Sequence, residues 1–198
     1  MRIYLYDFED SFTYNIYSLL KKLNCEVEVF HWSKIRELDI SGSKQPLGII
    51  YGPGPGHPDE YDIIDKINYL KSIDRVFQMG ICLGHQLLAQ SFGAKIVNAS
   101  KVIHGSNEDL VLSEKWLSFF KVNDDLKIKV QRYNSLAVNY SFEDSRELNL
   151  YLNSCQECVM QANKNTFSIQ FHPDSVGTNK PFLFFRPLIK FLERNNED

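Results

Sequence analysis

The 198-residue sequence has no long apolar run, no block of like charge and few cysteines. Its apolar stretches are only a few residues long, far below the roughly 20 needed to cross a bilayer, and Met1–Asp7 lacks the apolar core of a signal peptide. The formal net charge of −3 comes without the basic patch of a nucleic-acid-binding protein. Four cysteines are too few for a disulfide scaffold. We therefore expect a cytoplasmic protein with no membrane and no nucleic acid as partner.

What the sequence does contain is the composition of an ordinary globular domain. Hydrophobic residues make up 43%, charged residues 24% and aromatic residues 13%, and the length suits a single domain of roughly 100–200 residues. We expect residues 1–194 to form one domain and residues 195–198 a flexible tail.

Strand and helix signals alternate from the start of the chain. A strand at Ile3–Tyr6, a helix capped by Ser11 with apolar residues from Phe12 to Leu23, and a strand at Glu26–His31 predict the βαβ unit of a parallel sheet. Further strands are expected at Leu47–Tyr51, Val76–Met79, Lys95–Val97, Asp109–Leu112, Lys127–Val130, Leu148–Leu152, Val159–Ala162 and Thr166–Phe171. A closing helix over Pro181–Arg194 is expected to break at Pro187. These signals predict a single α/β domain with a mostly parallel open sheet flanked by helices.

The pattern Gly80-Ile81-Cys82-Leu83-Gly84 follows the expected strand 76–79 and precedes a helical run over 85–92. A Gly-x-nucleophile-x-Gly sequence between a strand and a helix is typical of a nucleophile elbow, here with cysteine as the nucleophile. The elbow would place the Cys82 sulfur at a helix N-terminus, where the helix dipole and free N–H groups favour the thiolate. The N–H of Leu83 would also stabilise a developing oxyanion.

A thiolate nucleophile needs a partner for proton transfer, and His172 is the strongest candidate among five histidines. It follows the apolar stretch 168–171 and precedes Pro173-Asp174, so a carboxylate two residues away is placed to orient the imidazole. His85 is the rival candidate, but it lies in the first turn of the nucleophile's own helix and has no obvious orienting acid. We expect Cys82, His172 and Asp174 to be the catalytic residues.

Two further motifs bear on ligand binding. The loop Gly52-Pro53-Gly54-Pro55-Gly56 follows a strand at the expected carboxyl edge of the sheet, where open α/β sheets bind ligands. Its N–H groups lie only at glycines, which suits the second half of an oxyanion hole, and its spacing is not that of a phosphate loop. Cys155-Gln156-Glu157-Cys158 is half of a zinc site without a second pair. We expect neither a metal nor a cofactor.

Together these motifs resemble the class I (triad) glutamine amidotransferases over nearly the whole chain, residues 1–194. Gly80–Gln86 is similar to the nucleophile motif of that family and Gln170–Ser175 to its histidine motif. Asp10–Asn15 is more discriminating, because it resembles the subgroup that serves anthranilate synthase and aminodeoxychorismate synthase. Further segments that fit this subgroup are Gly52–Pro58, Val102–Gly105 and Arg132–Leu136. The resemblance implies the flavodoxin-like α/β fold of these amidotransferases.

The resemblance also implies a role for each matching position. Cys82 would attack the side-chain amide of L-glutamine, and His172 would pass a proton to the departing ammonia. Backbone N–H groups of Gly54 and Leu83 would hold the oxyanion. The residues that would bind glutamine are Gly54, Pro55, Gly56, Leu83, Gln86, Ser135 and Leu136. The ammonia would pass to a separate chorismate-binding synthase subunit that makes anthranilate or 4-amino-4-deoxychorismate.

Two positions depart from the family pattern. The family usually has Glu where this chain has Asp174 and His where this chain has Asn134. The first change shortens the reach of the orienting carboxylate, and the second alters a contact near the glutamine pocket. These departures alone suggest one alternative interpretation, a non-catalytic regulatory homologue. A free-standing cysteine hydrolase of γ-glutamyl bonds on the same elbow fold is a second interpretation that stays open.

Overall fold

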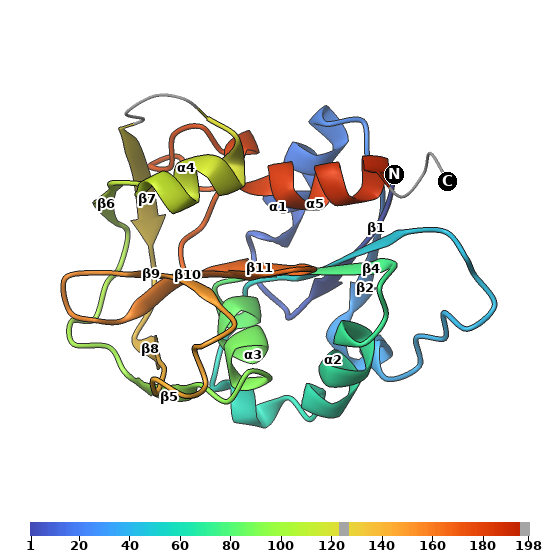
Figure 1. The fold of residues 1–198 in the computed structure, drawn as a ribbon, viewed down its shortest axis with the longest axis horizontal. Helices are drawn as coiled ribbons and strands as arrows, with labels where there is room; N and C mark the ends of the chain where they lie inside the picture. The colour runs from blue at the N-terminus through green and yellow to red at the C-terminus, as the bar shows by residue number, and fades with distance from the viewer. Residues whose placement is uncertain (123–126, 195–198) are drawn as a thin grey trace.

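The computed structural model describes residues 1–122 and 127–194, so the tail expected at 195–198 lies outside the described residues. Within them, helices cover both faces of a long sheet (Figure 1). The strands are β1 Arg2–Asp7, β2 Glu26–His31, β3 Leu47–Tyr51, β4 Val76–Ile81, β5 Lys95–Asn98, β6 Ser106–Leu110, β7 Ile128–Arg132, β8 Leu136–Asn139, β9 Asn149–Leu152, β10 Cys158–Asn163 and β11 Thr166–Ile169. The helices are α1 Thr13–Lys22, α2 Ile64–Lys71, α3 Leu83–Gln90, α4 Glu114–Phe120 and α5 Phe182–Arg194, with single 3₁₀ turns at Trp32–Ile35 and Pro58–Glu60.

The main sheet has the strand order β2-β1-β3-β4-β11-β10-β8-β5, and β9 pairs with β10 outside this path. Five neighbouring strands, β2, β1, β3, β4 and β11, are mutually parallel. Strands β10, β8, β5 and β9 form an antiparallel extension of the sheet. A separate antiparallel pair joins β6 to β7. The predicted α/β fold, with a mostly parallel sheet flanked by helices, is confirmed.

The core lies on both faces of this sheet because the parallel strands are apolar on both sides. On one face, residues such as Ile3 and Leu5 pack with α1, α4 and α5. On the other face, residues such as Ile49 and Tyr51 pack with α2 and α3. In Figure 1 the two helical layers lie above and below the sheet, which is seen edge-on. The carboxyl ends of the parallel strands therefore stay uncovered by these layers and are free to carry a site.

Two local predictions were wrong. Ser11 does not cap α1: the helix begins at Thr13, and Asp10 Oδ1 instead accepts a hydrogen bond from the Phe12 N–H at 2.8 Å. The closing helix does not break at Pro187, which lies inside an uninterrupted α5. The buried face of α5 packs on the sheet, and this burial offsets the roughly 3 kcal/mol that an internal proline costs.

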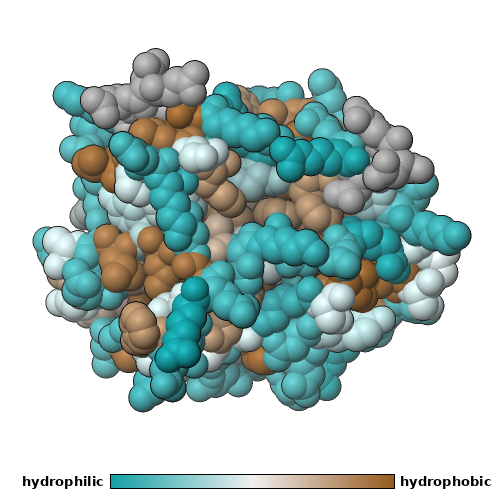
Figure 2. Space-filling view, in the orientation of Figure 1, coloured by the Kyte–Doolittle hydropathy of each residue, from teal (hydrophilic) through white to brown (hydrophobic). Residues whose placement is uncertain are grey.

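Two elements were not predicted, and one was displaced. Helix α4 and strand β8 lie in stretches where no regular structure was expected, and β6 begins three residues before the strand expected at 109–112. Among the described residues, no helix is long and apolar enough to cross a membrane. The visible surface is largely hydrophilic, with apolar side chains gathered around β9 (Figure 2).

Candidate active site

Cys82 occupies the sharp turn between β4 and α3. Its backbone angles, φ 54° and ψ −105°, lie outside the regions that a residue with a side chain normally adopts. Hydrogen bonds hold the turn on both sides, from Cys82 N to Ile169 O at 2.9 Å and from Gly84 N to Gly52 O at 3.2 Å. This is the geometry of a nucleophile elbow, which presents its side chain at the edge of the sheet.

Glycine is required on both sides of Cys82 because neighbouring backbone lies too close for a side chain. A Cβ on Gly80 would lie 2.3 Å from the carbonyl oxygen of Gly84, and a Cβ on Gly84 would lie 2.0 Å from that of Tyr51. In the loop after β3, a Cβ on Gly54 would lie 2.6 Å from Leu83 Cδ2. The glycine–proline loop therefore packs directly against the first residue of α3.

His172 reaches the same edge of the sheet from the neighbouring strand. β11 pairs with β4 in parallel, with Ile169 opposite Ile81. Cys82 directly follows Ile81, and the chain after Ile169 leads to His172. Parallel pairing thus brings together a cysteine and a histidine that are far apart in the sequence.

The side chain of His172 is buried between two aromatic rings. Those of Phe12 and Tyr133 lie with centroids 5.1 and 5.2 Å from the imidazole. The distance from His172 Nδ1 to Asp174 Oδ1 is 3.7 Å, which is longer than a direct hydrogen bond. Within the described part of the chain, neither this nitrogen nor either carboxylate oxygen of Asp174 has a hydrogen-bond partner. The short carboxylate therefore acts on the imidazole through charge.

The charge state of His172 follows from these neighbours. Burial alone would lower the pKa of the imidazole, but its interactions with Asp174 and Cys82 raise that pKa from 6.5 to about 10. The effect of Cys82 requires its sulfur to lie beside the imidazole. A protonated imidazole beside the cysteine sulfur is placed to give a proton to a leaving group.

His85, the rival base, lies in a different environment. It is fully buried, with Nδ1 2.8 Å from Ser168 Oγ and Nε2 3.0 Å from the carbonyl oxygen of Cys158. Burial lowers the pKa of His85 to about 4. A neutral histidine with both nitrogens hydrogen-bonded inside the core has a structural role, and this favours His172 as the base.

A cavity of about 170 Å³ opens beside Cys82. The residues that line it are Gly54, Pro55, Gly56, Cys82, Leu83, Gln86, Tyr133, Asn134, Ser135 and Leu136. All the residues predicted to bind glutamine lie in this wall, whereas His172 and Asp174 do not. Tyr133 and Asn134 also line the cavity but were not among the residues predicted to bind glutamine, although Asn134 was expected near the pocket.

Asn134 is anchored by a buried network next to the cavity. Arg132 Nε donates a hydrogen bond to Asn134 Oδ1 at 3.1 Å, and Asn134 Nδ2 donates to the carbonyl oxygen of Leu136 at 2.9 Å. The guanidinium of Arg132 also pairs with Glu108 at 2.7 Å and Glu157 at 3.4 Å. The amide at position 134 therefore fixes the cavity wall from behind.

The Cys-x-x-Cys pair forms no comparable site. Cys155 is exposed and Cys158 is buried, and both are free thiols. Burial raises the pKa of Cys158 well above its ordinary value, so this thiol is unreactive. In residues 1–122 and 127–194, no group of three or more His, Cys, Asp or Glu side chains is placed to hold a metal ion.

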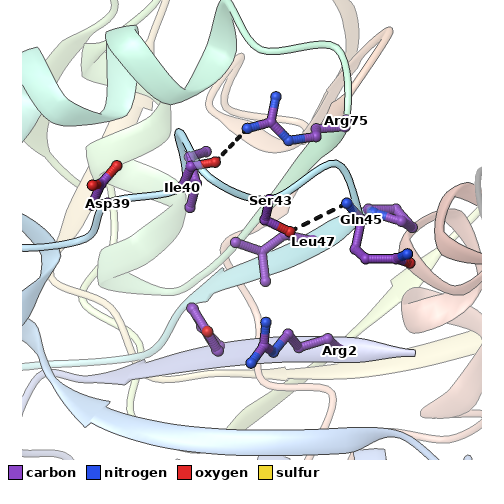
Figure 3. A pocket seen from close by; sticks show the side chains of 9 residues that line it. Arg2, Asp39, Ile40, Ser43, Gln45, Leu47 and Arg75 are labelled. Atoms are coloured by element: carbon purple, nitrogen blue, oxygen red, sulfur yellow. Dashed lines mark hydrogen bonds between the residues drawn. The ribbon is translucent and has the colours of Figure 1, made fainter.

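A second hollow lies at the opposite edge of the sheet, near the amino ends of β1, β3 and β4. It has a volume of about 50 Å³, and Arg2, Ser43, Gln45 and Arg75 are among the residues that line it (Figure 3). The guanidinium of Arg75 is hydrogen-bonded to the carbonyl oxygen of Ile40. This hollow is smaller than the cavity beside Cys82 and is lined by neither cysteine nor histidine, so the carboxyl-edge cavity is the candidate active site.

Comparisons with known proteins agree with this geometry. Anthranilate synthase component 2 of Saccharolobus solfataricus is 34% identical over 195 residues, covering 93% of this chain and 94% of that protein. Aminodeoxychorismate synthase component 2 of Escherichia coli is 33% identical over 180 residues, covering 88% of this chain and 91% of that protein. The bifunctional protein TrpGD of Thermotoga maritima is 34% identical over 184 residues, or 90% of this chain, but the chain spans only 30% of its length.

A solved structure and a family description complete the comparison. The crystal structure of a glutamine amidotransferase from Thermotoga maritima has a TM-score of 0.65 at 14% identity, and the match covers 100% of this chain and 86% of that one. At this identity the likeness shows the fold alone. The family described as glutamine amidotransferase class-I matches residues 4–191. The chain therefore belongs to the class-I glutamine amidotransferase family.

Proposed function

We propose that this chain hydrolyses L-glutamine to glutamate and ammonia through a thioester on Cys82. The proposal rests on one arrangement of residues. Cys82 lies in a strained turn after β4, His172 with its raised pKa lies beside the Cys82 sulfur, and a cavity opens beside Cys82. A thiolate with an adjacent imidazolium is the pair that acyl transfer from an amide requires.

In the first half of the reaction, the Cys82 thiolate attacks the side-chain amide carbon of glutamine and a carbon–sulfur bond forms. The resulting oxyanion accepts hydrogen bonds from the N–H groups of Gly54 and Leu83, the latter being the first residue of α3 and without an acceptor inside the helix. His172 gives its proton to the amide nitrogen, the carbon–nitrogen bond breaks, and ammonia leaves. Asp174 stabilises the positive charge on the imidazole before this transfer.

In the second half, His172 takes a proton from a water molecule that attacks the thioester. The carbon–sulfur bond breaks, glutamate leaves, and the thiolate and imidazolium are restored. Throughout, the substrate is held by the cavity wall, where the polar groups of Gln86 and Ser135 and the carbonyl of Leu136 lie. Gln86 is fixed by donating a hydrogen bond to Gln170 Oε1 at 3.2 Å, so its amide is oriented before glutamine arrives.

We further propose that the ammonia is consumed by a separate chorismate-binding synthase subunit, which makes anthranilate or 4-amino-4-deoxychorismate. The names of the relatives, which are second components of these two synthases, support both products. The free cysteines suit a cytoplasmic location, where thiols stay reduced. No metal or cofactor takes part in this reaction.

The experiment is the Cys82→Ser substitution in the complex with the synthase subunit that copurifies with this chain. Synthesis from L-glutamine should be lost, whereas synthesis from added ammonium salt should persist, because the acceptor chemistry belongs to the partner. Cys155→Ser, which changes an exposed free thiol, is the matched control and should retain both activities.

Each other outcome contradicts a part of the proposal. Loss of both activities in an intact complex rejects the division of labour between the subunits. Turnover that is equally fast with and without the partner identifies a free-standing hydrolase. Failure of a glutamine-analogue alkylator to label Cys82 of the wild-type chain identifies a non-catalytic homologue.

A further inference from the structure

Gln131, near the end of β7, is joined to the segment that carries His172. Its carbonyl oxygen accepts a hydrogen bond from the His172 N–H at 3.0 Å. Its own N–H donates to Thr178 Oγ1 at 3.0 Å, and the Thr178 hydroxyl donates to the carbonyl oxygen of His172 at 2.6 Å. The N–H of His172 is therefore hydrogen-bonded to Gln131 directly, and the carbonyl of His172 is connected to Gln131 through the Thr178 hydroxyl.

The side chain of Gln131 extends the same attachment. Its Oε1 accepts hydrogen bonds from the Gly177 N–H at 3.0 Å and from the Ser175 hydroxyl. Its Nε2 donates to the carbonyl oxygen of Gly105 at 2.8 Å. One amide thus connects the segment 172–178, which carries the base, to the segment 102–105, which was a motif without an assigned role.

The position of His172 depends on such contacts because its ring has little other support. Among the described residues, Nδ1 has no hydrogen-bond partner, and the ring is held by packing against Phe12 and Tyr133. Tyr133 is itself attached to this segment, since its hydroxyl lies 3.0 Å from Ser175 Oγ. A shift of the segment 172–178 would therefore move the imidazole away from the Cys82 sulfur.

We propose that Gln131 is a positioning residue that holds the His172 segment at the distance from Cys82 that proton transfer requires. The inference rests on the proposed glutaminase function and adds a residue to it. Gln131 does not line the cavity, so it acts through His172 and not on bound glutamine. Its removal affects the chemical step and leaves substrate binding unchanged.

The test compares Gln131→Met with Gln131→Glu in glutamine hydrolysis by the chain bound to its synthase subunit. Methionine keeps the length of the side chain but none of its hydrogen bonds. Glutamate keeps the acceptor for Ser175 and Gly177, but it replaces the donor to Gly105 with a carboxylate oxygen that faces the Gly105 carbonyl. The matched control is Gln161→Met, which removes a buried glutamine from strand β10 whose amide is hydrogen-bonded to Tyr140.

We expect Gln131→Met to lower kcat on the order of 10- to 100-fold, because a displacement of about 1 Å is enough for such a loss. KM should stay within about twofold of the wild-type value. Gln131→Glu should recover most of the lost kcat, and Gln161→Met should remain close to wild type. Inactivation by 6-diazo-5-oxo-L-norleucine should slow in parallel with kcat, and urea unfolding should show that each variant is folded.

Three results overturn the inference while the proposed function stands: a Gln131→Met kcat near the wild-type value, an effect confined to KM, or a Gln131→Glu variant as slow as Gln131→Met. If Gln131→Met does not fold, Ser175→Ala decides, since it removes one arm of the attachment and a kcat near wild type in that variant rejects the inference. A wild-type chain that neither hydrolyses glutamine nor reacts with the diazoketone refutes the proposed function and this inference with it.

Discussion

The carboxylate of Asp174 should determine how long His172 stays protonated as the pH rises. The two charged groups are 3.7 Å apart, and at an effective dielectric constant near 20 their attraction is worth about 4 kcal/mol. Because 1.36 kcal/mol corresponds to one pH unit of titration, an attraction of this size is enough to account for the share of Asp174 in the rise of the pKa of His172 from 6.5 to about 10, and Cys82 supplies the rest. In Asp174→Ala, the pKa of His172 should therefore fall from about 10 toward 6.5.

The direction of this pKa change determines which part of the pH profile should be measured. A raised pKa means that the imidazolium persists as the pH rises, so the alkaline limb of the glutaminase rate should lie near pH 10 in the wild-type chain. In Asp174→Ala this limb should move to lower pH by about one to three units. The stability that His172 contributes is present in full below about pH 6.5 and is lost as the pH rises through about 10. Urea unfolding of the variant should show a smaller loss over this range.

The rate at neutral pH should fall less than in variants of the reacting groups. Because Asp174 forms no direct hydrogen bond with the imidazole, Asp174→Ala should cost on the order of 10- to 100-fold, whereas Cys82→Ala and His172→Ala should be inactive. Asp174→Glu should be tolerated, since its carboxylate reaches about 1.5 Å further. A folded Asp174→Ala variant as inactive as His172→Ala, or one whose alkaline limb does not move, would refute this reasoning.

Two further predictions concern stability. Gly84→Ala should lower the free energy of unfolding, measured by urea titration, by about 3 kcal/mol or more, because the added Cβ would lie 2.0 Å from the backbone oxygen of Tyr51. The control is Gly42→Ala, whose Cβ would have nothing within 4 Å. It should change the free energy of unfolding by less than about 0.5 kcal/mol. Burial lowers the pKa of His85 to about 4, so between about pH 6.5 and 4 the unfolded chain binds a proton that the folded chain does not, and stability should fall by about 3 kcal/mol as the pH drops. His85→Gln should lose this dependence, and an unchanged dependence would show that another group titrates.

Local sterics explain why the sharp turn around Cys82 could be predicted from sequence. The contacts that require glycine at positions 80 and 84 arise within one turn and its neighbouring strand, so they leave a short pattern around Cys82. The position of His172 at the same edge of the sheet was predictable because an apolar strand ends just before it and a proline with a carboxylate follows. In both cases the residues adjacent in the sequence are enough to predict the local structure around the side chain.

The contacts that escaped prediction join distant parts of the chain. In the sequence, nothing distinguishes Gln131 from an ordinary strand residue. Its hydrogen bonds to Gly177 and Gly105 form only in the folded chain. The start of α1 was misplaced because Asp10 rather than Ser11 supplies the hydrogen bond there. Pro187 was expected to break α5 because its local cost is plain, while the packing that outweighs it comes from the sheet.

The place of β4 in the middle of the parallel strands has a consequence for biosynthesis. All six of its residues, Val76–Ile81, are buried, and one of its two neighbours is β11, Thr166–Ile169, which leaves the ribosome much later. At ordinary translation speeds, β4 stays an unpaired apolar edge for roughly 5–15 s. During this interval the nascent chain already carries Cys82 but not His172, so the two residues cannot meet before β11 is made, and the chain exposes a strand that chaperones would recognise.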